Sequence, residues 1–267
     1  MPRKGEAKTL AEAASAWALA RDLVFAPARA LRALHEDPEA LWSAARVYAA
    51  YLAFSTVFYA LKPAGFPPLG PEQPFTPPEG GLLFWAQVQA WSPPLTALLC
   101  ALTAFFLTLL AGRRLAPRLL AACASAAAPL ALLLIYRNTG MPRWALGAGL
   151  LALAALIGRR LRATDPSLWR PLAGWLLLVN ALNLALMPLF AAAVLLRAAL
   201  LYNGLEIALL FATLGWGTYG VARIARLPNA RAFCALFLAM LSQIVLVFAF
   251  HYLGALPRTV LKALMSV

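Results

Sequence analysis

The chain has 267 residues, of which 63% are hydrophobic and only 12% are charged, and its mean hydropathy is +0.76. Soluble domains are typically about half apolar and about a quarter charged. The composition therefore excludes a soluble globule, a disordered chain, a collagen and a disulfide scaffold. It predicts an all-α protein, a polytopic bundle of transmembrane helices.

The net charge is +13, and the basic residues form short clusters between apolar runs. Such clusters are typical of signals that orient membrane spans. Nucleic-acid-binding stretches, in which basic and aromatic residues alternate, do not occur. We therefore expect membrane lipids, and a protein partner or a second copy of the chain, as partners, and no nucleic acid.

Residues 1–37 are predicted to form a cytoplasmic or interfacial amphipathic segment. Apolar residues recur at helical spacing from Leu10 to Leu34, and charged residues lie elsewhere around the helix axis. Pro27 predicts a break in this helix. The charges interrupt the apolar core that a signal peptide needs, so we expect the segment to stay attached. It either lies among the lipid headgroups or docks on the protein's own cytoplasmic face.

Residues 38–256 are predicted to form the transmembrane domain, followed by a short tail at 257–267. About 20 apolar residues are needed to cross roughly 30 Å of hydrocarbon. The predicted spans lie near 40–61, 95–112, 118–136, 144–158, 172–191, 201–222 and 232–254.

Two stretches between the first and second spans are predicted not to cross by themselves. Residues 62–80 are rich in Pro and Gly and predict an irregular loop. Residues 82–91 carry two Trp and two Gln, which suits an interface helix, and Pro93 and Pro94 separate this helix from the second span.

The 144–158 segment is the shortest predicted span, because 15 residues cover only about 22 Å. The distribution of basic residues nevertheless favours seven spans with the N-terminus in the cytoplasm. In that topology the basic residues outside are only Lys62, Arg137, Arg143, Arg197, Arg258 and Lys262. The asymmetry nearly disappears if 144–158 and 172–191 do not cross. We expect the inner (cytoplasmic) membrane of a prokaryote.

Catalytic motifs are absent from the sequence, including HExxH, GxSxG and the phosphate-binding GxxxxGK[ST]. The two histidines, His35 and His251, fall on opposite sides of the membrane in the predicted topology, so they cannot share a metal or a haem. Cys100, Cys123 and Cys234 lie far apart within apolar stretches. We therefore predict a protein that is not an enzyme, with no catalytic residue, metal site or cofactor.

Polar residues at membrane depth are costly, which makes them the candidate functional residues. They are Arg46, Asn180, Asn183, Glu206 and His251. Glu206 and His251 lie near the outer ends of adjacent spans, where they either handle a proton or cation together or are stabilised separately, Glu206 by Arg197. Asn180 and Asn183 share a helix face and either line a pathway or bond between helices. Arg46 is expected to extend to the headgroups.

Three segments resemble the prokaryotic branch of the Yip family, the Ypt/Rab-interacting membrane proteins. They are PARALRALHEDPEALW (27–42), RLLAACASAAAPLALL (118–133) and the stretch from Asn203 to Leu241 that contains GWGTYG. Yip proteins usually have five spans, so the resemblance implies five Yip-like spans with 144–191 as an extra hairpin. The acidic, aromatic loop motif of the eukaryotic members is missing, and their binding of small GTPases is not carried over.

Two functional hypotheses follow. The first is a membrane-organising or scaffold subunit of Yip type, which binds anionic lipid or a partner through its N-terminal segment and arginine-rich loops. The second is a small transporter or channel whose path is lined by Asn180, Asn183, Glu206 and His251. The second hypothesis predicts that polar residues from different spans converge on a water-accessible cavity.

Overall fold

The computed structural model describes residues 4–63, 65–67, 80–112, 114–162 and 164–265. The described part of the chain is helical and contains no β-strand. Seven of its helical segments are long and apolar enough to cross a membrane: Ala40–Leu61, Leu82–Leu110, Leu115–Thr139, Arg143–Leu161, Pro166–Leu195, Ala199–Ala225 and Asn229–Tyr252. This confirms the predicted all-α polytopic bundle.

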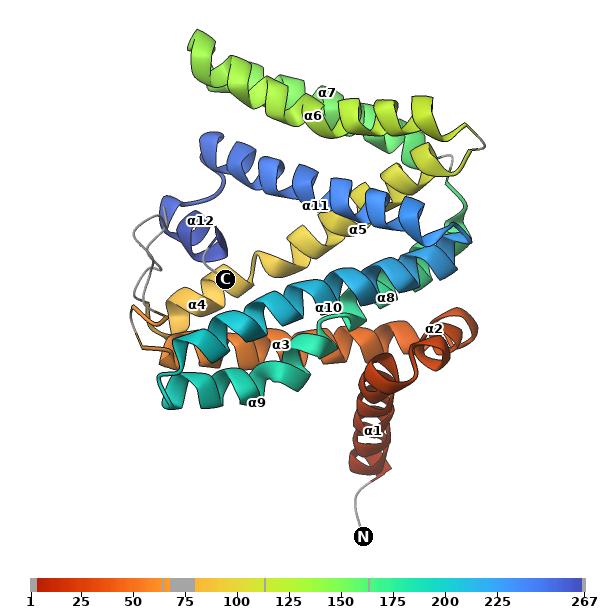
Figure 1. Cartoon of the computed structure of the whole chain (residues 1–267), viewed down its shortest axis with the longest axis vertical. Helices are drawn as coiled ribbons and strands as arrows, with labels where there is room; N and C mark the ends of the chain where they lie inside the picture. Colours follow the sequence, from red (N-terminus) through yellow and green to blue (C-terminus); the bar gives the residue numbers. More distant parts are fainter. Residues whose placement is uncertain (1–3, 64, 68–79, 113, 163, 266–267) are drawn as a thin grey trace.

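The spans run back and forth, so that successive turns alternate between two ends of the molecule (Figure 1). Their helices are α3 (Ala40–Leu61), α4 (Leu82–Gln89), α5 (Ser92–Leu110), α6 (Leu115–Thr139), α7 (Arg143–Leu161), α8 (Trp169–Leu178), α9 (Ala181–Leu195), α10 (Ala199–Ala225) and α11 (Asn229–Tyr252). We call the two ends the α2 end and the α12 end, after the short helices α2 (Pro27–Glu36) and α12 (Arg258–Met265) that lie there.

All the spans except the first are longer than predicted, and the second and fourth bear on the predicted topology. The second begins with α4, and Pro93 and Pro94 then lie in the first turn of α5, where proline is tolerated because the amide there has no partner in the helix. The 144–158 segment becomes α7 with 19 residues, about 28 Å at 1.5 Å per residue. The length of α7 therefore no longer argues against a crossing. Most of the predicted loop at 62–80 lies outside the described residues.

The fifth span is interrupted in its middle. A short 3-10 helix at Pro166–Leu168 leads into α8, and α8 ends before Val179 and Asn180, after which α9 continues. Asp165 caps this segment by accepting a hydrogen bond from the Ser167 amide at 2.9 Å. The same hydrogen bond lowers the pKa of the Asp165 carboxyl.

Two tryptophans tie the centre of the bundle together. Trp175 of α8 is fully buried, and its Nε1 donates to the Trp216 carbonyl of α10 at 3.0 Å. Trp216 Nε1 in turn donates to the Leu23 carbonyl at 2.8 Å. These bonds connect α8, α10 and the N-terminal helix in one core.

The N-terminal segment folds into α1 (Lys4–Phe25) and α2, with the break at Ala26 that Pro27 predicts. Both helices dock on the bundle, where Leu23, Ala30 and Leu34 are buried. Figure 1 shows α1 lying across the direction of the spans. The side chains of residues 4–14 lie outside the described part.

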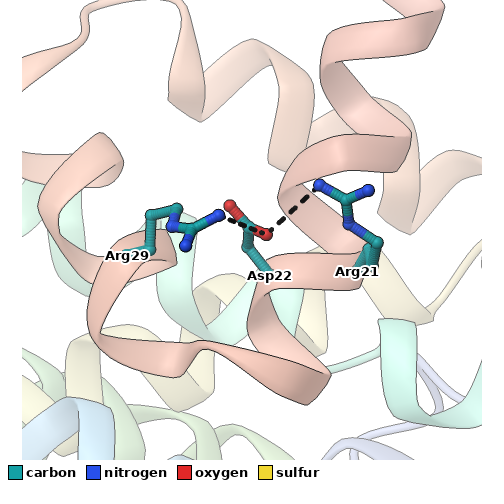
Figure 2. Close-up of polar contacts among 3 residues, drawn as sticks. All are labelled: Arg21, Asp22 and Arg29. Atoms are coloured by element: carbon teal, nitrogen blue, oxygen red, sulfur yellow. Dashed lines mark ion pairs between the residues drawn. The ribbon is translucent and has the colours of Figure 1, made fainter.

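A small charge cluster lies at the break between α1 and α2. Asp22 lies between Arg21 and Arg29, with an N···O distance of 3.7 Å to each (Figure 2). Both arginine side chains are mostly exposed, and exposed ion pairs contribute little to stability. The angle between the helices is therefore held mainly by the buried apolar residues.

The C-terminal tail contains a helix that the sequence analysis did not predict. Val260 and Leu261 of α12 are buried in a cluster with Trp85 of α4 and Val247 of α11. The α12 helix thus closes the α12 end of the bundle beside the second and last spans.

Candidate functional site

A polar face of α3 points into the bundle. Its residues follow one another at intervals of three or four, which keeps them on one side of the helix: Tyr48, Tyr51, Ser55, Tyr59 and Lys62. Gln89 Nε2 donates to Ser55 Oγ at 2.8 Å, and Ser92 Oγ donates to Gln89 Oε1 at 3.0 Å. The hydroxyls of Tyr48 and Thr96 lie 2.9 Å apart. Hydrogen bonds therefore join this face to α4 and α5 over much of the span.

Beside this face, α3, α9 and α10 enclose a cavity of about 80 Å³, which we call the α3–α9–α10 pocket. Its polar lining consists of Tyr51, Ser55, Tyr59, Asn183, Tyr202 and Glu206. A water molecule needs roughly 10–15 Å³ of such space. The pocket therefore suits a few waters or a small inorganic ion and is too small for an organic solute.

Lys62 lies beside the pocket, against the lining residues Tyr59 and Tyr202. Its Nζ donates to the Tyr202 hydroxyl at 3.2 Å and lies 4.9 Å from the centre of the Tyr202 ring and 5.6 Å from that of Tyr59. Burial lowers the pKa of Lys62, and the Glu206 carboxylate opposes this shift. The aromatic rings supply cation–π contacts to an ammonium group that has lost part of its water.

Glu206 connects the pocket with the outside of the bundle. It is four residues from Tyr202 on α10, a spacing that places both side chains on one face of the helix. Tyr202 is buried, whereas Glu206 is exposed. A carboxylate and a phenol thus line a pocket of water size, and the Lys62 ammonium donates to the phenol from beside the pocket. Such a set can accept, hold and release a proton.

The structure brings two of the five predicted residues together, because Asn183 and Glu206 both line the pocket. Asn180 lies at the interruption between α8 and α9, where its Nδ2 donates to the carbonyls of Leu176 and Leu177 at 3.2 Å. It bonds along its own span, not across to another helix.

His251 and Arg46 lie away from the pocket. The Nδ1 atom of His251 is 2.9 Å from the Leu256 carbonyl, in the turn that leads to α12. Arg46 is exposed in the first half of α3. Among the described residues, no ion pair joins Glu206 to Arg197 or His251.

The sequence analysis missed Lys62, Tyr202 and the polar face of α3. One feature of the sequence could have indicated them. Polar residues between 48 and 62 recur at the spacing of one helix face, and they do so in the least hydrophobic of the seven spans. Within the described residues, no three His, Cys, Asp or Glu side chains lie close enough together to hold a metal ion.

Comparison of the chain with protein-family models, with curated proteins and with solved structures gives no significant match. The resemblance to the Yip family therefore stays a prediction from the three sequence segments.

Proposed function

We propose that this integral membrane protein is not an enzyme but a small transporter or channel that passes protons through the α3–α9–α10 pocket. One observation carries the proposal. Tyr202 and Glu206 line a pocket within a bundle of membrane-spanning helices, and the Lys62 ammonium donates to the Tyr202 hydroxyl. Ionisable side chains at this depth are costly, and they commonly mark a path for ions or protons.

The size and charge of the pocket favour a proton over other species. A cavity of about 80 Å³ excludes organic solutes, and the Lys62 ammonium beside Glu206 repels other cations. Glu206 lies seven residues from Ala199, the first residue of α10 at the α12 end, and can take up a proton from that side of the membrane. The hydroxyls and amides along α3 and α4 provide partners for waters that would carry the proton toward the α2 end.

Basic residues support an orientation with the α2 end in the cytoplasm of a prokaryotic cell. The spans and turns at this end carry Arg114, Arg118, Arg159, Arg160, Arg162, Arg170, Arg223, Arg226 and Arg231. The α12 end carries fewer, and Glu206 would therefore face the outer side.

The proposal is tested in liposomes that contain the purified protein, a pH gradient and an entrapped pH-sensitive dye. We expect wild-type protein to dissipate the gradient faster than empty liposomes. We expect Glu206→Gln to lower that flux at least about tenfold, since a positioned proton-transfer group typically contributes that much or more. Glu39→Gln, which removes an exposed acid at the start of α3, serves as the matched control and retains the flux. Equal rates for wild-type and empty liposomes would overturn the proposal.

A scaffold of Yip type is the second candidate, and the docked N-terminal helices favour it. Arg29 and Arg32 are exposed on α2, at the end of the bundle where most of the arginines lie. One preparation of the protein can distinguish the two functions. A protein that passes no protons, but keeps a stoichiometric protein partner through purification in mild detergent, supports the scaffold.

A further inference from the structure

A large apolar crevice lies on the other side of the molecule from the α3–α9–α10 pocket. It has a volume of about 1040 Å³ and separates the α6–α7 hairpin from α5 and α11; Figure 1 shows this hairpin at one edge of the bundle. Ligand pockets commonly measure roughly 300–1,000 Å³. The crevice is therefore large enough for a substantial ligand.

The crevice follows the direction of the spans. On α7 its lining extends from Gly147 near the α12 end to Leu161 at the α2 end, which is about 21 Å at 1.5 Å per residue. Leu151 and Leu156 of the lining remain exposed, so the crevice opens on the outside of the bundle. Its shape suits extended hydrocarbon chains that lie parallel to the helices.

The protein alone leaves this region incompletely packed. Leu146 is the one buried residue of α7 among those described. Ser242, on the α11 wall, is 2% exposed, and its hydroxyl has no hydrogen-bond partner among the described residues. An apolar space without contacting atoms loses the dispersion energy of its walls, so the surrounding hydrocarbon is expected to fill it.

The charge at one mouth of the crevice selects the occupant. Arg160 lines the crevice at the α2 end, and Arg159 and Arg162 flank it in the sequence. The nearest acid along the chain, Asp165, already accepts the Ser167 amide. An amphiphile with a negative headgroup complements this end, and its apolar chains complement the rest of the crevice.

We propose that the crevice binds an anionic phospholipid of the surrounding membrane, with its phosphate at Arg160 and its acyl chains between the α6–α7 hairpin and α5 and α11. The lipid site does not depend on the proposed proton path, which uses other helices.

The test is to purify the protein from vesicles that contain equal amounts of phosphatidylglycerol and phosphatidylcholine, and to count the retained lipids by native mass spectrometry. We expect wild-type protein to retain phosphatidylglycerol about fivefold over phosphatidylcholine, the preference that one well-placed arginine provides. Arg160→Gln removes the preference, whereas the neighbouring Arg159→Gln, which does not line the crevice, keeps it.

A second pair of variants tests the place of the acyl chains. Ala154 lines the crevice and Ala155 does not. Ala154→Trp is therefore expected to lose the bound lipid, and Ala155→Trp to keep it. Gly158→Leu is a milder filling variant, because a Cβ at this lining residue meets no atom within 4 Å, and it too should lose lipid.

Three results would overturn the proposal: equal retention of both lipids by wild-type protein, equal effects of the two arginine variants, and undiminished lipid in folded Ala154→Trp and Gly158→Leu. Loss of a dimer in place of loss of lipid would assign the crevice to a second copy of the chain. The proton flux of all these variants is expected to stay at the wild-type level. A failure of the lipid proposal can therefore be distinguished from a failure of the proton-path proposal.

Discussion

Lys62 shows how a single residue can acquire its role from distant parts of the chain. It directly follows the first span and lies 140 positions before Tyr202, to whose hydroxyl it donates. Sequence reasoning placed it in a loop because its neighbours are Pro and Gly. Glu206 and Asn183, by contrast, could be selected from the sequence, because polar residues within an apolar run are conspicuous.

The pKa of Lys62 leads to a prediction at this scale. Burial lowers it and Glu206 raises it, so Glu206→Gln is expected to lower it further. The chain has only four lysines, Lys4, Lys8, Lys62 and Lys262. Reductive ¹³C-methylation therefore gives few enough NMR signals to follow each one during a pH titration, with Lys62→Arg as the assignment control.

The sign of the effect on stability follows from the same shift. A folded-state pKa below the unfolded value means that charging Lys62 opposes folding. Stability is therefore expected to rise as the pH increases through the folded pKa toward 10.5. A Lys62 signal that titrates with the other lysines, or that moves upward in Glu206→Gln, would contradict this account of the site.

Among the helices, α10 shows how glycines allow close packing. A Cβ at Gly220 would overlap the Trp175 indole of α8, and one at Gly217 would lie 2.8 Å from Leu236 of α11. Gly215, in the same GWGTYG stretch, has open space around it. The glycine run therefore serves helix packing at two of its three positions.

This contrast predicts opposite outcomes for two identical substitutions. Gly220→Ala is expected to lower the free energy of unfolding by about 1–3 kcal/mol, the usual cost of overpacking, because the fully buried Trp175 has little room to move. Gly215→Ala is expected to be neutral or up to about 1 kcal/mol stabilising, because alanine favours the helix. Thermal unfolding in one detergent measures both, and a stable Gly220→Ala would show that the helices can separate there at little cost.

At the scale of the whole molecule, the turns alternate between two ends that differ in charge. Seven crossings account for this alternation, and the arginines gather at the α2 end. The membrane potential and the insertion machinery retain positive loops on the cytoplasmic side. The α2 end is therefore expected to lie in the cytoplasm.

Cysteine labelling tests this orientation. In a chain with Cys100, Cys123 and Cys234 replaced by Ala, Arg258→Cys at the α12 end is expected to react with a membrane-impermeant maleimide in intact bacterial spheroplasts. Asn229→Cys, at the α2 end, is expected to react only after lysis. Both positions are exposed, so accessibility within the protein does not bias the comparison, and the reverse pattern would invert the topology.

The sequence by itself determined the membrane class, the number of spans and the break at Pro27, because each depends on composition and spacing along a single helix. Only the tertiary structure decided which polar residues meet. Asn180 and Asn183 share one face in sequence terms, yet the interruption between α8 and α9 leaves Asn183 in the pocket and turns Asn180 to the carbonyls of its own span. The crevice behind the α6–α7 hairpin likewise depends on how whole helices are positioned, which no local pattern specifies.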